Sequence, residues 1–512
     1  MLLLDLPTEL LRDIIQQSIP EGFENVMLSC KTIHAYGHEL IKDYNAKREE
    51  CRDVSFNINN NRNALYWLYR VAKEPSLPHY MRTVDLNGYK EYKRYSTLGM
   101  FSIDLRKTAA YREFDKLKDN EVVLQHIKEL ITSSPYLPDG DESFWIKSLL
   151  SDLGDADHYS EHDFFAGVFF LTLLPNTRTL TLPWNTSCVP CTFDARINGI
   201  HQYENVFNEI QCKARSLHVD ASLSKLKRLE FLLQAEYDTK ERLGFLAPFL
   251  ILPNLETLFA TSLVAVNYSY PFTWSYPEVN SNLRSIELVH CAMDASGVSE
   301  LLAHMPHLIS FRYSHGSKHH GVEAYWDAGA FVAAIGRHVG GQLQHLAITV
   351  EIHGLNEIMT AVTSMREFIR LETLEVDYAY FCGPSIESGE QTFLGKPPNP
   401  GHQEWTVDAI PSLQQILPSS LQSLIVFIEP NSDLKIDVAR PLFLLFAGFA
   451  SVRPLALPSL ERCEVHCRGT NFGINEEQSL IHDYLKAEGV HCRFGIQLES
   501  PWRLAFRAQF GR

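Results

Sequence analysis

Apolar residues recur along this chain in a short pattern, in which an apolar residue is followed by others three and five positions later. The clearest copy is LRSIELVHC, where Leu283, Ile286 and Leu288 precede Cys291. Such alternation of apolar and polar residues predicts a short strand that buries one face. The first two apolar positions of the other copies are Met81/Val84, Leu226/Leu229, Leu255/Leu258, Leu308/Phe311, Leu343/Leu346, Leu371/Leu374, Leu421/Leu424 and Leu460/Cys463, and in one more copy Thr177 replaces the leucine before Leu180.

The spacing of these copies indicates a repeat. Copies that begin at 226, 255, 283 and 308, and again at 343 and 371, lie 25 to 29 residues apart, and the other steps are longer. This period, with Cys291 closing the clearest copy, is typical of leucine-rich repeats. One repeat cannot bury its own leucines, so stacked repeats would form an irregular α/β solenoid with a concave strand face. The alternative is a set of ordinary buried strands in an α/β domain.

Two segments between the copies have the spacing of amphipathic helices. Val298, Leu301, Leu302 and Met305 predict one helix, and the apolar residues of 355–369 predict another. The expected unit is therefore a strand followed by a helix.

The chain begins with a strongly patterned helix. Asp5 and Pro7 suit a helix start, and Glu9 suits its first turn. Five apolar residues then recur at helical spacing on one stripe, namely Leu6, Leu10, Leu11, Ile14 and Ile15. Pro20 and Gly22 end this helix, and a second apolar stripe begins at Phe23.

The pattern divides the chain into three parts. Residues 1–50 are a small helical module, 51–165 are a linker and an irregular early repeat region, and 166–512 hold the repeats. A module of about fifty residues needs a partner or an adjoining domain to complete its burial. It can dock another protein, or it can cap the end of the repeat array. Residues 87–162 predict an insertion or a poorly ordered excursion, and the Gly- and Pro-rich 382–405 predict an exposed loop.

Two long apolar runs, 164–175 and 441–452, are too short to cross a bilayer and predict buried core segments. The start of the chain lacks a basic flank, so we expect no secretory signal and a cytoplasmic or nuclear protein. Most of the 10 cysteines would then be free thiols.

Charge argues against two classes of partner. The chain has 62 acidic and 46 basic residues, a net charge of −16, and no basic stripe. It should therefore repel phosphate backbones and anionic headgroups, so we expect neither nucleic acid nor a membrane as a partner.

Candidate chemistry is sparse. Cys188, Cys191, Cys212 and His218 offer zinc ligands, but without paired spacing in the second half, so buried thiols are the preferred interpretation and no metal or cofactor is expected. The histidines of SHGSKHHG, beginning at His315, are expected to be solvated. The motifs of serine hydrolases, metalloproteases, P-loop proteins and dinucleotide-binding proteins do not occur. No sequence motif therefore supports a catalytic role.

Residues between the repeat leucines should face solvent on the concave side. Their charges are of mixed sign, so phosphate recognition is not predicted. They are Glu230, Glu256, Glu287, Glu372, Glu375, Glu461 and Glu464 with Arg178, Lys227, Arg228, Arg284, Arg312 and Arg462.

An aromatic row lies at YSYPFTWSY, where five rings alternate with other residues from Tyr268 to Tyr276. In an extended chain all five would share one side, and Pro271 favours an edge or a loop. The row can fill a core or form a recognition surface. We favour the core.

The first fifty residues also resemble a known family. LPTELLRDI followed by LSCKTI resembles an F-box over residues 3–48, and the repeats resemble the leucine-rich domains of F-box proteins, especially the divergent fungal ones. The resemblance implies contact with a Skp-type adaptor through Leu6, Pro7, Leu10, Leu11, Ile14, Ile15, Leu28, Cys30 and Lys31. Ile33 stands where many F-boxes carry Trp, which removes a large aromatic anchor.

The resemblance implies a non-catalytic substrate-recognition subunit of an SCF-type ubiquitin ligase. The adaptor would link it to a cullin, and the repeats would bind an unknown target protein. The alternative is a leucine-rich scaffold that binds proteins without ubiquitin transfer, and a hydrolase with an unrecognised site is a distant third.

Overall fold

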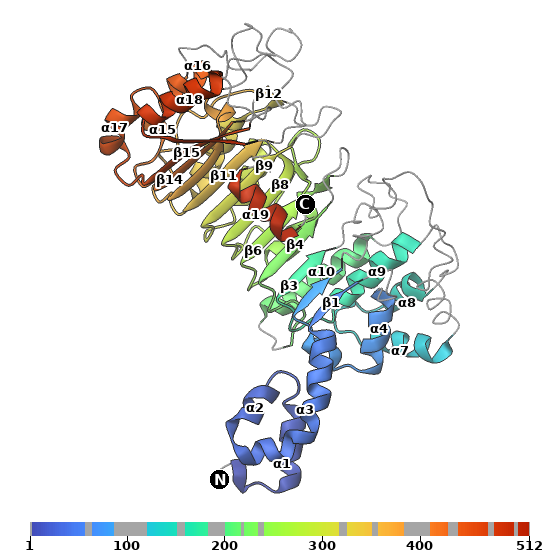
Figure 1. The fold of residues 1–512 in the computed structure, drawn as a ribbon. Coiled ribbons are helices and arrows are strands. Elements are labelled where there is room, and N and C mark those ends of the chain that lie inside the picture. The colour runs from blue at the N-terminus through green and yellow to red at the C-terminus, as the bar shows by residue number, and fades with distance from the viewer. Residues whose placement is uncertain are drawn as a thin grey trace. The chain divides into compact units, whose positions relative to one another are not determined.

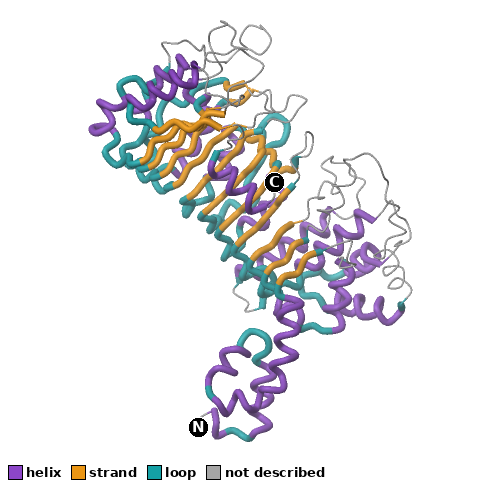
Figure 2. Tube along the Cα trace, viewed as in Figure 1, coloured by secondary structure: helices purple, strands orange, loops and turns teal. Residues whose placement is uncertain are grey.

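The described residues have a mixed α/β architecture, as predicted. A computed structural model describes residues 3–56, 64–86, 120–150, 159–182, 200–216, 220–233, 240–316, 325–350, 357–382, 410–428, 439–468, 476–495 and 500–510. The chain divides into two compact units: Met1–Leu232 with Leu252–Leu255, and Leu233–Ile251 with Glu256–Arg512. In each unit the main strands form a parallel open sheet with helices beside it (Figures 1 and 2).

The first unit begins with three helices and continues into a sheet with the order β1-β2-β3-β4. Figure 1 shows α4, α8, α9 and α10 grouped on one side of these strands. The elements are η1 Leu3–Asp5, α1 Thr8–Gln17, α2 Phe23–Ser29, α3 Lys31–Cys51, β1 Asp53–Ser55, α4 Ala64–Lys73, η3 Leu77–Tyr80, β2 Thr83–Asp85, α7 Glu121–Thr132, α8 Glu142–Leu150, α9 Tyr159–Leu171, β3 Thr179–Leu182, α10 Ile200–Arg215 and β4 Arg228–Leu232.

The second unit has the strand order β6-β8-β9-β11-β13-β14-β15-β16, with β7 beside β8, β5 beside β7, and a separate pair, β10 and β12. Its elements are β5 Glu241–Arg242, η7 Leu243–Leu246, α11 Ala247–Leu250, β6 Thr257–Thr261, β7 Leu263–Ala265, β8 Ser285–Met293, α12 Ala295–Leu302, β9 Ser310–His315, β10 Tyr325–Trp326, α13 Ala328–Val339, β11 His345–Val350, β12 Glu357–Ile358, β13 Thr373–Asp377, α14 Ala379–Cys382, α15 Leu413–Ile416, β14 Ser423–Ile428, α16 Ala439–Leu445, α17 Phe449–Ala456, β15 Arg462–Arg468, α18 Glu476–Ala487, β16 His491–Gly495 and α19 Pro501–Phe510.

The predicted copies of the apolar pattern form parallel strands in matching register. Within each unit the middle residue of each copy pairs with the middle residue of the next, and all of these side chains are buried. In the first unit the row is Val54, Val84, Leu180 and Leu229, and in the second it is Leu258, Ile286, Phe311, Leu346, Leu374, Leu424 and Cys463. Because a parallel strand is hydrogen-bonded to its neighbours alone, each strand depends on the next for this burial.

The row starts earlier than the sequence predicts. β1 precedes the copy at Met81 and pairs with β2, so Val54 and the buried Cys51 and Phe56 make up a further copy. Its first residue is a cysteine rather than a leucine, which explains why the leucine pattern missed it.

The helix predicted around Val298 is confirmed as α12. Asp294 caps it by accepting a hydrogen bond from the backbone N–H of Gly297 (2.6 Å), and Asp327 caps α13 in the same way from Ala330 (2.9 Å). Gly297 allows close packing, because a Cβ there would lie 2.9 Å from Cβ of Ala265.

The helix predicted over 355–369 is wrong. From residue 357 the chain forms the short strand β12 and then an extended segment with turns. Its backbone hydrogen bonds go to distant partners, since the N–H groups of Val362 and Met365 donate to the carbonyls of Tyr380 and Ile416. Ile369, which the helical stripe would bury, is 66% exposed. Tertiary hydrogen bonds and burial thus override the local helical spacing.

Residues 120–150, within the predicted insertion or excursion, form the helices α7 and α8. Ile127, Ile131 and Trp145 are fully buried there, so this part is a packed helical insertion. The predicted loop at 382–405 lies, except for Cys382, outside the described residues.

Both apolar runs supply core residues, but 441–452 is a buried core segment only in part, since 447, 448 and 450–452 are exposed. In 164–175 these include Val168, Phe169 and Phe170. Within the described chain, 439–456 is the one helical stretch whose length and composition meet the minimum for crossing a membrane. Gly448, with φ +69°, separates it into α16 and α17, and Leu442 and Phe449 are buried in the unit.

The centre of the aromatic row lies in the core, which is the interpretation favoured from the sequence. Phe272 and Trp274 are buried, and the Trp274 ring stacks on His304 with centroids 4.8 Å apart. The expectation of five rings on one side is wrong, because Val266 and Tyr270 form an antiparallel bridge that turns the chain and leaves Tyr268 66% exposed.

His315 also differs from its expected solvated state. It ends β9, is fully buried, and stacks on Trp326 with centroids 4.0 Å apart. His319 and His320 lie outside the described residues.

The register of the buried row predicts a large cost for Ile286→Ala. Ile286 lies between Leu258 and Phe311 and is fully buried, so the truncation should lower the free energy of unfolding by about 2–5 kcal/mol. Urea denaturation measures it, and Ile369→Ala, the same change at an exposed site, is the control. Equal midpoints for the two variants would contradict the register.

Trp274→Ala should destabilise the second unit by about 3–5 kcal/mol, because it removes a buried ring. It also removes the indole N–H that donates to the carbonyls of Tyr276 and Val279, both at 3.0 Å. Tyr268→Ala, at the exposed end of the row, should leave the unfolding midpoint within error. A midpoint for Trp274→Ala that stays at the wild-type value would disprove the core assignment.

Candidate functional site

The first three helices form a small module with its own apolar core. α3 contacts both α1 and α2. Leu11 and Ile15 of α1 are buried with Phe23 and Met27 of α2 and Ile33 of α3. Ile33, at the position of the expected aromatic anchor, is therefore an interior residue.

Gly37 allows the three helices to pack closely. A Cβ at this position would lie 3.0 Å from Cγ2 of Ile15 and still nearer to the sulfur of Met27. A larger residue there would require the Met27 and Ile15 side chains, or α3 itself, to shift.

The structure separates the nine predicted adaptor-contacting residues into two groups. Leu11 and Ile15 lie inside the module, at 3% and 1% exposure, so they support its surface from within. The other seven are at least partly accessible: Leu6 and Cys30 are half-buried, and Pro7, Leu10, Ile14, Leu28 and Lys31 are exposed.

Exposed apolar side chains concentrate on this module. Leu10 and Ile14, one helical turn apart on α1, are 49% and 36% exposed, and Leu28 is 81% exposed. With Leu3 and Leu4, they make five of the twelve large exposed apolar side chains in the described part of the chain. This concentration on so small a module makes it the candidate protein contact surface of the described chain. We call Leu3, Leu4, Leu10, Ile14 and Leu28 the apolar patch.

Aromatic rings connect the module to the sheet that follows. The Tyr44 ring of α3 lies 4.6 Å from the Phe23 ring and 5.7 Å from the Tyr80 ring of η3, centroid to centroid. Lys47 of the same helix pairs with Glu74 after α4. α3 is therefore packed at both ends.

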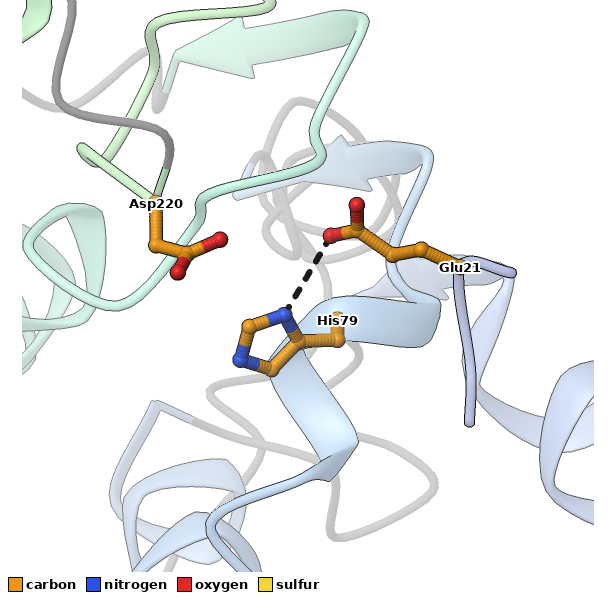
Figure 3. Close-up of side chains that lie close together, drawn as sticks. All are labelled: Glu21, His79 and Asp220. Carbon is orange, nitrogen blue, oxygen red and sulfur yellow. Dashed lines mark hydrogen bonds and ion pairs between the residues drawn. The ribbon is translucent and has the colours of Figure 1, made fainter. Parts of the chain in front are cut away.

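A polar junction forms the second connection, and it centres on Glu21 in the turn between α1 and α2. Figure 3 shows Glu21 beside His79 of η3, whose Nδ1 lies 3.4 Å from the carboxylate, with Asp220 nearby. The side-chain amide of the fully buried Asn176 donates to Glu21 (2.5 Å), and the Lys225 ammonium donates to the other carboxylate oxygen (3.3 Å).

Asn176 organises this junction. Its amide group donates to the backbone carbonyl of His79 (2.8 Å) as well as to Glu21, and its side-chain oxygen accepts from Lys225 (2.6 Å). The Arg82 guanidinium donates to the backbone carbonyl of Asn176 (3.2 Å). Segments up to about two hundred positions apart in the sequence thus meet at one buried amide.

Burial has the largest single effect on the pKa of Glu21 and raises it. The hydrogen bond from Asn176, the charge of Lys225 and the remaining hydrogen bonds together lower it by more than burial raises it, so that the net pKa lies below its usual value. Glu21 is therefore ionised at neutral pH.

Glu21, His79 and Asp220 have ligand atoms within 4.8 Å of one another, a spacing that suits a metal ion. The residues fit one poorly, because one carboxylate oxygen of Glu21 already binds the Lys225 ammonium and the other binds Asn176. We interpret the cluster as a structural junction.

Charged residues on the strand faces pair with one another. Arg228 donates to Glu230 (2.7 Å), Arg312 to Glu287 (2.9 Å), and both Arg462 and Arg493 to Glu464 (2.8 and 3.1 Å). The hydrogen bonds from Arg462 are the main cause that lowers the pKa of Glu464 to about 2. The expectation that these positions are solvated is wrong for Glu287 and Glu464, which are buried by their partners.

The candidate zinc ligands are not brought together in the described residues. Cys212 is an exposed free thiol on α10, and Cys188, Cys191 and His218 lie outside the described ranges.

Comparison with models of protein families finds no match for this chain, and comparison with curated proteins finds none either. The assignment of function therefore depends on the residues and their geometry.

Sequence reasoning missed the junction around Glu21. One signal was available, since Asn176 and Lys225 both precede predicted strands at similar distances. Glu21 itself has no periodic pattern, and its partners are 155 and 204 positions away.

Glu21→Gln should remove a pH-dependent contribution to the stability of the first unit. Because folding lowers the pKa of Glu21, its contribution is complete above the ordinary value of 4.5 and disappears as the pH falls through the folded pKa. In urea denaturation the free energy of unfolding of the wild type should exceed that of the variant near neutral pH, and this difference should shrink as the pH falls. The difference should be small, since the carboxylate is 37% exposed.

Glu9→Gln, at an exposed glutamate of α1, is the control. A wild-type advantage over Glu21→Gln that persists unchanged to pH 3 would contradict the ionised junction.

Proposed function

We propose that this chain is the substrate-recognition subunit of an SCF-type ubiquitin ligase. In this proposal residues 1–50 are an F-box that docks a Skp-type adaptor, and the parallel strands are a leucine-rich-repeat solenoid that holds the target protein. The adaptor links the chain to a cullin, and the catalysis belongs to those partners.

The apolar patch is the observation that carries the proposal. The three-helix module has completed its core with Leu11, Ile15 and Ile33, yet it still exposes Leu10, Ile14 and Leu28. Leaving large apolar side chains in water costs free energy that a partner recovers by covering them. These exposed residues belong to the motif that resembles an F-box.

The attachment of the module also supports a docking role. A ligase subunit must hold its target in a fixed place relative to the adaptor, and α3 runs without a break from the module to β1. The Glu21 junction and the contact between Tyr44 and Tyr80 oppose free rotation of the module about that helix.

A scaffold without ubiquitin transfer is the alternative, and it uses the same surfaces. The two differ in one result: a ligase subunit requires the apolar patch for the turnover of its bound target, and a scaffold does not. Target turnover in cells that carry the patch variant below separates them.

Leu10→Asp with Ile14→Asp should abolish co-purification of a Skp-type adaptor. Both positions are exposed, so the carboxylates stay solvated in the free protein and the module remains folded. In a complex they would be buried without partners, at a cost of about 1–3 kcal/mol or more each. Adaptor recovery is measured by affinity pull-down of the full chain.

The matched control is Val452→Asp with Leu455→Asp, which changes two exposed apolar residues of α17 at 37% and 86% exposure. It should bind the adaptor as the wild type does. Undiminished adaptor recovery with the Leu10 and Ile14 variant, or no recovery with the wild type, would refute the proposed docking role.

A further inference from the structure

Helix α19 lies across the strand face of the second unit. Positions 259, 287, 312, 347 and 375 pair in sequence from β6 to β13, so they form one row on one face. The rings of Phe506 and Phe510 lie 6.2 and 5.2 Å from the Phe259 ring, centroid to centroid, at one end of this row. At the other end the backbone N–H of Trp502 donates to Glu375 (3.2 Å). Figure 1 shows α19 in front of these strands.

The face recognises one side of this helix. Trp502, Phe506 and Phe510 are spaced i, i+4 and i+8, so their rings follow a single stripe. Trp502 and Phe506 are each 2% exposed, whereas Leu504, off the stripe, is 39% exposed. Aromatic residues at this spacing are typical anchors of a helix bound to a surface.

Charge fixes the direction of the helix. The carboxylate of Glu375 accepts a hydrogen bond from the first turn of α19, where the helix dipole is positive. α19 carries Arg503 and Arg507 and no acidic residue. Arg503 is only 8% exposed, and its charge acts on the buried Asp377 of β13. Burial raises the pKa of Asp377 to about 7, and the charge of Arg503 opposes this effect.

Buried polar groups without hydrogen bonds lie at and beside this contact. Among the described residues, the indole Nε1 of Trp502, the hydroxyl of Ser500 and the hydroxyl of Tyr380 have no hydrogen-bond partner. Tyr380 lies near the start of α19, since the charges of Asp377 and of Arg503 in α19 both act on its hydroxyl. Ser500 and Trp502 belong to the docked segment itself, so Tyr380 is the group of the face that another helix could satisfy, and a helix that does so would bind this face better than α19 does.

We propose that this face is a helix-docking site, filled by α19 in the free protein and by a helical segment of the target during recognition. The target segment carries aromatic residues at i, i+4 and i+8, a basic residue beside the first of them, and no acidic residue on that side. This inference rests on the proposed function, because it names the class of target that the ligase subunit takes. α19 is then a built-in competitor that a target displaces.

The test uses the full chain and, as probe, a fluorescently labelled peptide with the sequence of residues 500–510. Phe506→Asp with Phe510→Asp in the protein removes the anchors of its own helix and should empty the face. This variant should bind the peptide at least ten-fold more tightly than the wild type in fluorescence anisotropy. Leu504→Asp, on the exposed side of α19, is the matched control and should bind it as the wild type does.

A third substitution checks the location of binding. Phe259→Asp, added to the emptied variant, should abolish peptide binding, because it removes the ring that Phe506 and Phe510 contact. A peptide in which Trp502, Phe506 and Phe510 are replaced by Ala should not bind either. Equal peptide binding by the wild type and a folded emptied variant would overturn the proposal, as would binding that survives Phe259→Asp.

If the emptied variant gives no cooperative melting transition, hydrogen exchange of the wild type decides the question. The peptide, at a concentration on the order of 1 mM to match an intramolecular competitor, should speed amide exchange in 502–510 and leave the exchange of β8 to β13 unchanged. Unchanged exchange in α19 would overturn the proposal. The adaptor takes no part in these measurements, so their failure is distinguishable from the loss of adaptor binding that would refute the proposed function.

Discussion

The structure depends on one constraint, which is that no strand can bury its central apolar residue alone. Ile286 is covered because Leu258 and Phe311 lie beside it in register, and each of those depends in turn on its own neighbour. A shift of one residue in any strand would turn its apolar positions to the opposite face. The register therefore holds the strand face in place and fixes which charged residues meet on it, such as Arg312 and Glu287.

This constraint is local enough to be read from the sequence, which explains where prediction succeeded. The triplets at Leu283, Leu371 and Leu421 predict their strands because each strand needs the same three apolar positions. The connections between strands obey no such rule. Residues 355–369 have the spacing of a helix, but the chain gains more from hydrogen bonds to Tyr380 and Ile416 than from a helix of its own. Distant partners of this kind leave no periodic signal.

The same limit applies to the candidate site. The spacing of Leu10, Leu11, Ile14 and Ile15 predicts a helix with an apolar side, but it does not say which half of that side meets the rest of the module. The position of α3 decides this, and it depends on Gly37, where the absence of a side chain lets α3 cover Leu11 and Ile15 while Leu10 and Ile14 stay outside. The Glu21 junction was equally hidden, because its geometry exists only after Asn176 and Lys225 have been brought together by folding.

A bound helix within the same chain has a consequence for selectivity. α19 is tethered beside its site, so its effective concentration is on the order of millimolar without any new contact. A target helix must bind the face tightly enough to displace the tethered α19, and a weakly binding aromatic segment from an unrelated protein would not do so. The Tyr380 hydroxyl, which α19 leaves without a hydrogen bond, would give such a helix its advantage in binding, since a helix that pairs with Tyr380 gains a hydrogen bond that α19 lacks. Selectivity would then arise from the buried Tyr380 hydroxyl, with the aromatic stripe setting the position of the helix.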